Sequence, residues 1–177
     1  MNKTISSDNH SRHRCEWAST APDFPHYHDN EWGFPVDDDQ RLFEKLCLET
    51  FQSGLSWRTI LSKRENFRAA FEGFDFHKVA QFGEENVAIL LKNDGIVRNK
   101  RKILAVINNA KRAIEMVEKE GSLAAFIWRY EPDENTLPPP ETQTTCAESI
   151  ALAKALKKRG WQFVGPTTLY AFMQSMG

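Results

Sequence analysis

Residues 103–114 read Ile-Leu-Ala-Val-Ile-Asn-Asn-Ala-Lys-Arg-Ala-Ile, and their apolar positions recur with the period of an α-helix. Residues 43–51 and most other segments repeat that spacing, whereas no segment of useful length alternates apolar and polar residues as a half-buried strand does. The pattern therefore predicts an all-α protein. The expected helices span residues 38–53, 57–71, 75–81, 84–93, 99–119, 122–129, 146–159 and 166–176.

Residues at the expected helix ends agree with these limits. Ser56 can cap the helix that begins at the next residue, and Pro166 suits a first helical turn. Gly95 and Gly160 suit helix C-termini. Residues 131–145 are rich in proline and form a long irregular connection, which is expected to cross the surface between two lobes.

The length of 177 residues fits one domain. Residues 1–13 are almost without apolar side chains, so we expect a flexible tail there and no secretory signal. Residues 14–177 are expected to form a single domain, with a hairpin region at about residues 84–112 and with the N- and C-terminal segments in a second lobe. No apolar run approaches the length of a membrane span.

The chain has three cysteines, Cys15, Cys47 and Cys146, which are far apart and include no C-x-x-C pair. An odd number of separated cysteines argues against a disulfide framework and for a reducing compartment. The expected location is therefore the cytoplasm, and a monomer with no membrane partner is expected.

The net charge is −1, so the chain lacks the overall basicity of many nucleic-acid-binding proteins, but its charges are segregated. Residues 95–114 contain six basic and no acidic residues, and residues 154–159 form a second basic run. Each run taken alone is usually a solvated helix face. Two runs beside glycine turns favour a surface that contacts phosphates.

Residues 27–33, Tyr-His-Asp-Asn-Glu-Trp-Gly, place a phenol, an imidazole, an amide, carboxylates and an indole close together, and Glu49 and Trp57 follow soon after. A connecting loop normally uses small polar residues, because large aromatic side chains expose apolar area unless something covers them. Flat rings beside hydrogen-bond acceptors indicate a pocket for a flat, hydrogen-bonding ligand.

Glu49 lies three residues after Leu46 and seven after Leu42, at the margin of the apolar face of its expected helix. Glu44 and Lys45 are expected to point to the other side. A carboxylate at such a margin is usually a surface group. If Glu49 is buried it needs a hydrogen-bond donor, because an unpaired carboxylate in apolar surroundings is strongly disfavoured or takes up a proton.

Six ordered stretches of the chain carry a family resemblance. They are CEW at residues 15–17, YHDNEWG at 27–33, LE at 48–49, GLSW at 54–57, KRENF at 63–67 and KKRGWQFVGPTT at 157–168. Together they resemble the bacterial 3-methyladenine DNA glycosylase I family, over the chain from Cys15 to the last residue. The resemblance implies an all-helical helix-hairpin-helix glycosylase that excises 3-methyladenine from alkylated double-stranded DNA.

The resemblance also implies a pocket for the excised base. A base inside a duplex is inaccessible, so such an enzyme rotates the nucleotide out and holds the base between aromatic surfaces. Glu49 is the implied catalytic carboxylate, which accepts hydrogen bonds from the adenine edge. Tyr27 and Trp57 are implied to contact the ring. Trp32 is a suitable further wall, and Trp17 is another candidate.

The expected reaction is hydrolysis without a lyase step. Many related helix-hairpin-helix glycosylases place an aspartate beside the sugar, but no Asp occurs between Asp94 and Asp133 here. Methylation at N3 makes the base cationic within the nucleotide and weakens its bond to the sugar, so binding and positioning matter more than a strong base. We therefore expect water to attack the sugar while Glu49 favours the departing base, without a Schiff-base lysine.

Residues 94–99, Asp-Gly-Ile-Val-Arg-Asn, are the candidate hairpin between two expected helices. The common alternative is a plain glycine cap at a helix C-terminus. In the context of the resemblance, backbone amides at the start of the following helix are expected to point at a phosphate. The expected DNA contacts are Gly95, Arg98, Lys100 and Arg101.

Cys15 and His28 correspond to half of a zinc site in the family, where a His and a Cys shortly after the segment matching residues 173–177 complete it. Taken alone, such a Cys and His are more often packing and surface residues. Structural zinc needs four protein ligands, and the other N-terminal histidines sit in or near the expected tail. Either the sequence lacks an extension that supplies the missing ligands, or this member has lost half of the site. The chemistry itself needs no cofactor.

Two other functions fit part of the pattern. A non-catalytic helix-hairpin-helix module that senses damaged DNA needs the basic residues but not Glu49 and Trp57 together, so their joint presence favours an enzyme. A metallohydrolase based on Cys15, His26 and His28 is disfavoured, because no histidine pair has helical ligand spacing with an adjacent general base.

Overall fold

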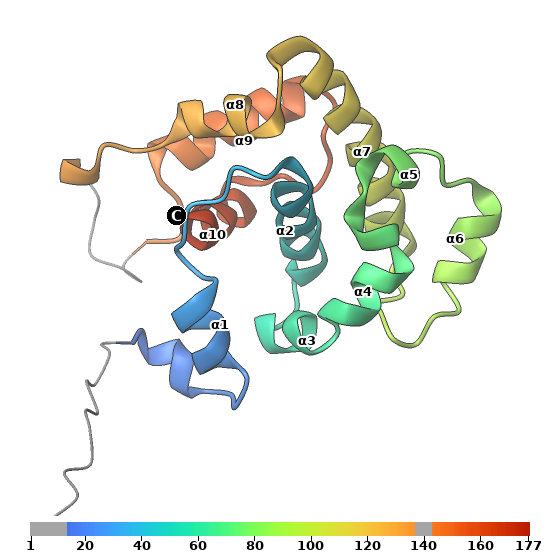
Figure 1. Cartoon of the computed structure of the whole chain (residues 1–177), viewed down its shortest axis with the longest axis horizontal. Helices are drawn as coiled ribbons and strands as arrows, with labels where there is room; N and C mark the ends of the chain where they lie inside the picture. Colours follow the sequence, from blue (N-terminus) through green and yellow to red (C-terminus); the bar gives the residue numbers. More distant parts are fainter. Residues whose placement is uncertain (1–13, 137–142) are drawn as a thin grey trace, which may run out of the picture.

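The computed structural model describes residues 14–136 and 143–177, which form helices and turns with no strand among them (Figure 1). The predicted all-α fold is confirmed. Within the described residues, no helix is both long and apolar enough to cross a bilayer. The elements are η1 (Glu16–Ser19), α1 (Phe24–Asn30), α2 (Asp39–Gln52), α3 (Trp57–Ser62), α4 (Arg64–Ala70), η2 (Glu72–Phe74), α5 (Phe76–Val79), α6 (Glu84–Leu90), α7 (Lys100–Glu120), α8 (Leu123–Ile127), η3 (Trp128–Tyr130), η4 (Glu134–Thr136), α9 (Ala147–Lys158) and α10 (Pro166–Met176).

Two of the expected features fall outside the described residues. The expected tail at residues 1–13 is one, and the consecutive prolines at 138–140 of the expected surface crossover are the other. Within the described chain, buried residues from α2, α4, α7, α9 and α10 belong to one hydrophobic core.

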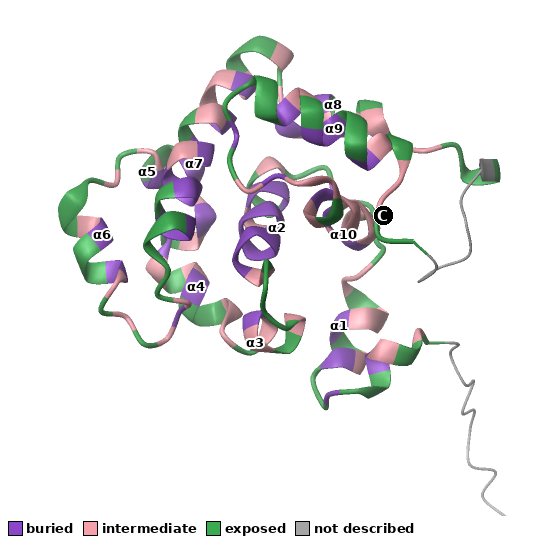
Figure 2. Ribbon diagram, turned by 180° about the vertical axis from the view of Figure 1, so that it is seen from behind, coloured by how far each residue is buried: buried purple, intermediate pink, exposed green. Residues whose placement is uncertain are grey.

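Helix α2 lies at the centre of the molecule, between α7 and α10 (Figures 1 and 2). Asp38 caps its N-terminus by accepting a hydrogen bond from the backbone N–H of Arg41 at 2.8 Å. Leu42, Phe43 and Leu46 are almost fully buried, and Figure 2 shows burial around most of the helix. Polar side chains on a helix enclosed in this way must find partners inside the protein.

Helix α7 carries the periodic stretch and confirms its predicted spacing. The Asn99 side chain caps the helix by accepting from the backbone N–H of Lys102 at 3.2 Å. Ile103, Val106 and Ala110 are fully buried on one face. Gly121, with φ +91°, ends the helix in a conformation that favours glycine.

Lys102 joins the start of α7 to the end of α2. Its Nζ donates hydrogen bonds to the backbone oxygens of Phe51 at 2.8 Å and Ser53 at 2.5 Å. The last carbonyls of a helix have no partner within the helix, so this buried ammonium satisfies two groups that otherwise need water. The contact holds the basic N-terminus of α7 beside the loop that leads to Trp57.

Replacing Lys102 by Met is expected to lower the free energy of unfolding by about 1–3 kcal/mol, because two partly buried carbonyls lose their donor. Urea unfolding followed by circular dichroism measures the change. The matched control is Lys100→Met, at an exposed position on the same helix, with an expected change within about 0.5 kcal/mol. Equal stabilities of the two variants would contradict the role given to Lys102.

The expected single helix at residues 57–71 is wrong, because the structure breaks it into α3 and α4 at Lys63. Lys63 has φ −103° and ψ 2°, and its backbone N–H donates to the oxygen of Ile60 at 3.1 Å to close the last turn of α3. Ile60 and Phe67 are both fully buried and lie seven residues apart. The apolar period therefore continues across the break and conceals it.

Helix α1 has no counterpart among the expected helices. Pro25 lies in its first turn, and Phe24 and Tyr27 are buried three residues apart. A helix of seven residues is too short for an apolar period to stand out in the sequence. The backbone N–H of Gly33, just after α1, donates to the oxygen of Ser175 at 3.3 Å, so the end of α10 lies beside α1.

The caps were predicted correctly at three of four positions. Ser56 accepts from the backbone N–H of Thr59, Pro166 occupies the first turn of α10, and Gly160 follows α9 with φ +83°. Gly95 ends no helix, because α6 stops at Leu90. A Cβ at Gly95 would lie 3.1 Å from Cβ of Asn66 in α4, so the loop packs closely against α4 and a larger residue there would have to displace Asn66 slightly.

Candidate active site

Helices α1, α2 and α3 bring together the three residues expected to hold a base. Tyr27 and Glu49 are each 5% exposed, and the rings of Tyr27 and Trp57 lie 5.3 Å apart between centroids at a 42° angle. Tyr27 comes from α1, Glu49 from the last turns of α2, and Trp57 is the first residue of α3. The carboxylate and the two rings therefore share one recess, as a base-binding pocket requires.

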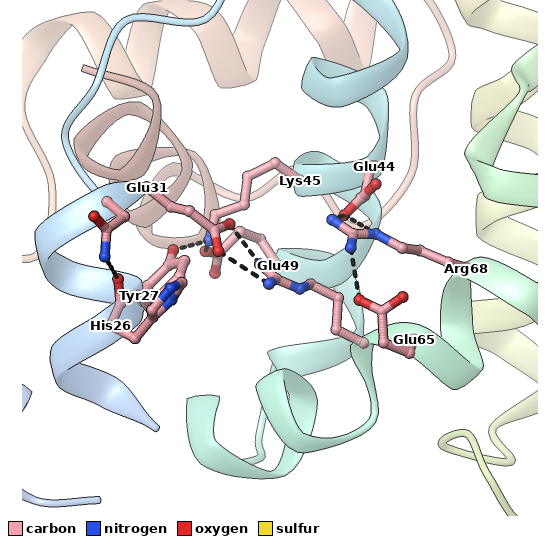
Figure 3. Close-up of polar contacts among 10 residues, drawn as sticks. His26, Tyr27, Glu31, Glu44, Lys45, Glu49, Glu65 and Arg68 are labelled. Atoms are coloured by element: carbon pink, nitrogen blue, oxygen red, sulfur yellow. Dashed lines mark hydrogen bonds and ion pairs between the residues drawn. The ribbon is translucent and has the colours of Figure 1, made fainter. Parts of the chain in front are cut away.

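Lys45 enters this recess, which the sequence did not predict. Its Nζ lies 3.4 Å from Oε1 of Glu49 and donates to the hydroxyl of Tyr27 (Figure 3). The same Nζ is 3.7 Å from the ring centroid of Trp57. The expectation that Lys45 points away from Glu49 is wrong. Residues four apart in a helix lie one above the other on the same face, and this face of α2 is turned toward α1.

Burial shifts the pKa of Lys45, Glu49 and Tyr27. Desolvation lowers the pKa of Lys45 to about 8, although the charge of Glu49 opposes that change. Desolvation also raises the pKa of Glu49 above its usual range, and Lys45 counteracts the shift. The pKa of Tyr27 is raised by burial and by the nearby carboxylates of Glu49 and Glu31, so its hydroxyl stays protonated.

Two ion-pair groups tie α1 and α2 to α4 at the rim. Arg64 donates to both carboxylate oxygens of Glu31, at 2.5 and 3.0 Å. Arg68 donates to Glu44 at 2.7 and 2.9 Å and to Glu65 at 2.6 Å (Figure 3). The bidentate Arg64 pair fixes the end of α1 over the recess.

Eleven residues line a pocket at this place, with an empty volume of about 400 Å³ that includes the part open to solvent. Lys45 is in the lining, whereas the buried Glu49, 3.4 Å from its Nζ, is not. The lining consists of Tyr27, Glu31, Arg41, Glu44, Lys45, Leu48, Trp57, Arg64, Arg68, Ser175 and Met176.

Trp17 and Trp32 lie outside that lining and form an aromatic cluster with His28. The Trp32 and His28 rings stack at 5.6 Å between centroids, and Trp17 meets Trp32 edge-on at 5.4 Å. Trp17 also lies 6.2 Å from the ring of Tyr27. The two tryptophans therefore support α1 and Tyr27 from outside the recess.

Cys15 and His28, the predicted zinc ligands, are brought together. The backbone N–H of Cys15 donates to Nε2 of His28 at 3.3 Å, and Nδ1 of His28 lies 3.1 Å from Oδ1 of Asp29. When Nδ1 of an imidazole donates its proton to a carboxylate, Nε2 carries the lone pair. Many zinc-binding histidines have this arrangement. Within residues 14–136 and 143–177, no three His, Cys, Asp or Glu side chains are placed to hold a metal.

The predicted DNA contacts Arg98, Lys100 and Arg101 are exposed at the start of α7. The guanidinium of Arg101 lies 5.9 Å from the ring centroid of Phe163. The side chains of Arg98 and Lys100 form no hydrogen bond or ion pair with the part of the chain that is described. Their charges are therefore available to an external anion.

The loop that contains Gly95 is fixed against the helices of the pocket. Nζ of Lys63, at the junction of α3 and α4, donates to the backbone oxygen of Asp94 at 2.9 Å. The backbone N–H of Gly95 donates to the Asn93 side chain at 2.9 Å. The candidate hairpin at residues 94–99 and the pocket therefore both contact the segment formed by α3 and α4.

The second basic run is at least partly structural. Nη2 of Arg159 donates to Glu120 at 2.7 Å, and its guanidinium lies 4.5 Å from the ring centroid of Phe126. These contacts join the end of α9 to the end of α7 and to α8. Lys154, Lys157 and Lys158 are exposed.

The residues of the recess that sequence reasoning missed include Lys45, Glu31 and Arg64. The spacing of Lys45 and Glu49 is a recognisable helical pair, so that contact could have been found. Glu31 and Arg64 are 33 residues apart, and no local pattern joins them.

Known proteins are similar to this chain in sequence and in structure. A family model described as methyladenine glycosylase matches residues 17–177. Over 171 residues the chain is 46% identical to "DNA-3-methyladenine glycosylase 1" of Escherichia coli (strain K12), which covers 93% of this chain and 90% of that protein. It is 45% identical over 168 residues to "DNA-3-methyladenine glycosylase" of Haemophilus influenzae, with 93% and 91% covered.

A solved structure agrees with the sequence relatives. It is described as the structural basis of 3-methyladenine recognition by 3-methyladenine DNA glycosylase I from Staphylococcus aureus. It superposes with a TM-score of 0.86 at 33% identity, over 93% of this chain and 89% of that one. The chain belongs to the methyladenine glycosylase family.

Proposed function

We propose that this protein removes 3-methyladenine from alkylated double-stranded DNA by hydrolysing the N-glycosidic bond. The observation that carries the proposal is the buried carboxylate of Glu49, which lies beside the same Lys45 ammonium as the paired rings of Tyr27 and Trp57. A base rotated out of the duplex needs both features, aromatic surfaces for its faces and hydrogen-bonding groups for its edge. The recess supplies them from three helices that the core fixes in place.

The charge of the recess suits this lesion. Methylation at N3 makes the base cationic while it is attached to the sugar, and a cation is attracted to an aromatic face and to a carboxylate. The resulting weak glycosidic bond requires little more than positioning, with Glu49 stabilising the departing base. Water then attacks the sugar, and no covalent intermediate with the protein forms.

Release of free 3-methyladenine from methylated DNA, followed by chromatography, tests the proposal. The expected result is time-dependent release by the protein, with the DNA strand intact until alkali is added. A non-catalytic damage-sensing module binds the same DNA and releases nothing. Binding without release would therefore overturn the enzymatic function in favour of that alternative.

The exposed start of α7 is the proposed contact with the DNA backbone. Replacing Arg98 and Lys100 by Ala is expected to weaken binding to damaged and undamaged duplexes alike, and to reduce the slope of log K against log salt by about 1–2. Fluorescence anisotropy at several salt concentrations measures both effects. The control replaces Lys78 and Lys119, which removes equal charge elsewhere on the surface. A loss confined to damaged DNA would contradict a phosphate contact.

Cys15 and His28 are the proposed ligands of a structural zinc ion. The Nε2 atom of His28 is an acceptor beside Cys15, which fits zinc chemistry if the metal replaces the hydrogen bond that Nε2 accepts from the Cys15 backbone N–H. The other ligands have to come from outside the described residues. Elemental analysis is expected to find one zinc per chain in wild type carrying its natural C-terminus, and less in Cys15→Ser. Wild-type protein without zinc would reject the metal site. Zinc would stabilise the fold and take no part in the reaction.

A further inference from the structure

The Lys45 ammonium occupies the position that the proposed function assigns to a cationic base. It lies 3.7 Å from the ring centroid of Trp57, 4.7 Å from that of Tyr27 and 3.4 Å from the Glu49 carboxylate. Those are the aromatic faces and the acceptor that a cationic purine requires. Lys45 is 6% exposed, so its side chain lies inside the protein and not at the rim.

A purine and this ammonium cannot share the face of Trp57. Stacked rings approach to about 3.5–4 Å, which is the distance already taken by Nζ of Lys45. Glu49 is buried and does not line the pocket, whereas Lys45 lines it and lies 3.4 Å from the carboxylate. The base must therefore remove the lysine before it can reach the carboxylate.

We propose that Lys45 is an internal occupant of the base site, which fills the recess in the free protein and leaves it when a methylated base enters. The inference rests on the proposed function, because it names the ligand of the same recess. The inference assigns to Lys45 the control of access to Glu49. The affinity for every base is lowered by the free energy of the contacts that Lys45 must give up. An ammonium that must be displaced discriminates against bases that cannot replace its contacts with Trp57 and Glu49.

The pocket allows the lysine to leave. Its four-carbon side chain is flexible, and the pocket that it lines is partly open to solvent. Burial also disfavours the ammonium, since it lowers the pKa of Lys45 to about 8. Charged and titratable groups from three helices surround Nζ. They are Glu49, Glu44 and Arg41 of α2, Tyr27 of α1 with Glu31 directly after it, and Arg64 and Arg68 of α4.

The sign of the pH effect follows from the two positions of the lysine. Inside the recess the pKa of Lys45 is about 8, and in water it returns to its ordinary value of about 10.4. At a pH between about 8 and 10.4, Lys45 is therefore mostly neutral inside the recess and mostly charged in water, so its displacement by the base takes up a proton. Base affinity is expected to be independent of this group below pH 8 and to weaken as the pH rises above 8.

Affinity for free 3-methyladenine, measured by quenching of tryptophan fluorescence, provides the first test. Lys45→Met keeps the length of the side chain without its charge, and it is expected to bind the base about tenfold more tightly than wild type, since it gives up no ion pair or cation–π contact. The decline above pH 8 should be absent from this variant. Lys78→Met, at an exposed site on α5, controls for the loss of one charge. Equal or weaker binding by Lys45→Met overturns the proposal.

Chemical labelling of the unaltered protein provides the second test and does not depend on the folding of a variant. Reductive methylation with formaldehyde, read by peptide mass spectrometry, is expected to be slow at Lys45 in the free protein and several-fold faster with saturating 3-methyladenine. Protection of Lys45 by the base would mean that the lysine stays as a ligand, and it overturns the proposal.

If wild type releases 3-methyladenine from DNA and both tests fail, only this inference is lost. If neither wild type nor Lys45→Met binds or releases the base, the proposed function fails and the inference with it.

Discussion

Replacing Glu49 by Gln is expected to slow the release of 3-methyladenine by about ten- to a hundredfold, because hydrogen bonds to a charged group are worth roughly 1.5–3 kcal/mol and part of that is lost. Gln has the same shape and keeps one acceptor oxygen, so the recess stays filled. It lacks the negative charge that stabilises a cationic base and its departure. Single-turnover assays with saturating protein measure the chemical step separately from binding.

The pH dependence separates a catalytic carboxylate from a merely structural one. Burial raises the pKa of Glu49, so activity should be lost as the pH falls through a value above the usual range for a glutamate. The Gln variant should lack this acid limb. Glu65→Gln is the matched control, since Glu65 is exposed and outside the pocket lining. Unchanged release by Glu49→Gln would refute the role given to the carboxylate.

The sequence predicts the large helices well because burial leaves a periodic trace. In α2 and α7, core residues such as Phe43, Leu46, Ile103 and Val106 recur at helical spacing, and the structure buries all of them. The same logic fails where the period is too short, as in α1, or continues across a break, as at Lys63. The spacing of apolar residues indicates which face of a helix is buried. It does not indicate where the chain turns between two helices that bury the same face.

The site was predictable in its parts and not in its arrangement. Glu49, Tyr27 and Trp57 were expected from the family resemblance, and the structure brings the two rings together and places all three residues around Nζ of Lys45. Their relative positions depend on tertiary contacts, such as the Arg64 pair with Glu31, that join residues far apart in the chain. Enclosure of α2 on most sides was equally invisible, and it is the reason that a lysine beside Glu49 turns inward.

Replacing Trp57 by Ala is expected to weaken binding of free 3-methyladenine by about ten- to a hundredfold, since stacking of a base on an aromatic side chain is worth roughly 1–3 kcal/mol. Trp57 supplies the ring nearest to Nζ of Lys45 and lies 5.3 Å from the ring of Tyr27. Its Nε1 is buried and has no hydrogen-bond partner in the described parts of the chain, so it remains a donor for a ligand. Calorimetry at a fixed pH below 8 measures the affinity without the contribution of lysine titration.

Two further variants show whether the loss comes from stacking. Trp57→Phe keeps an aromatic face and should recover part of the affinity that Trp57→Ala loses. Trp32→Ala removes a ring of equal size that stacks on His28 outside the pocket lining. It should lower thermal stability more than base affinity. If Trp32→Ala weakens base binding as much as Trp57→Ala, the base does not stack on Trp57 alone, and the wall of the recess extends to the cluster around His28.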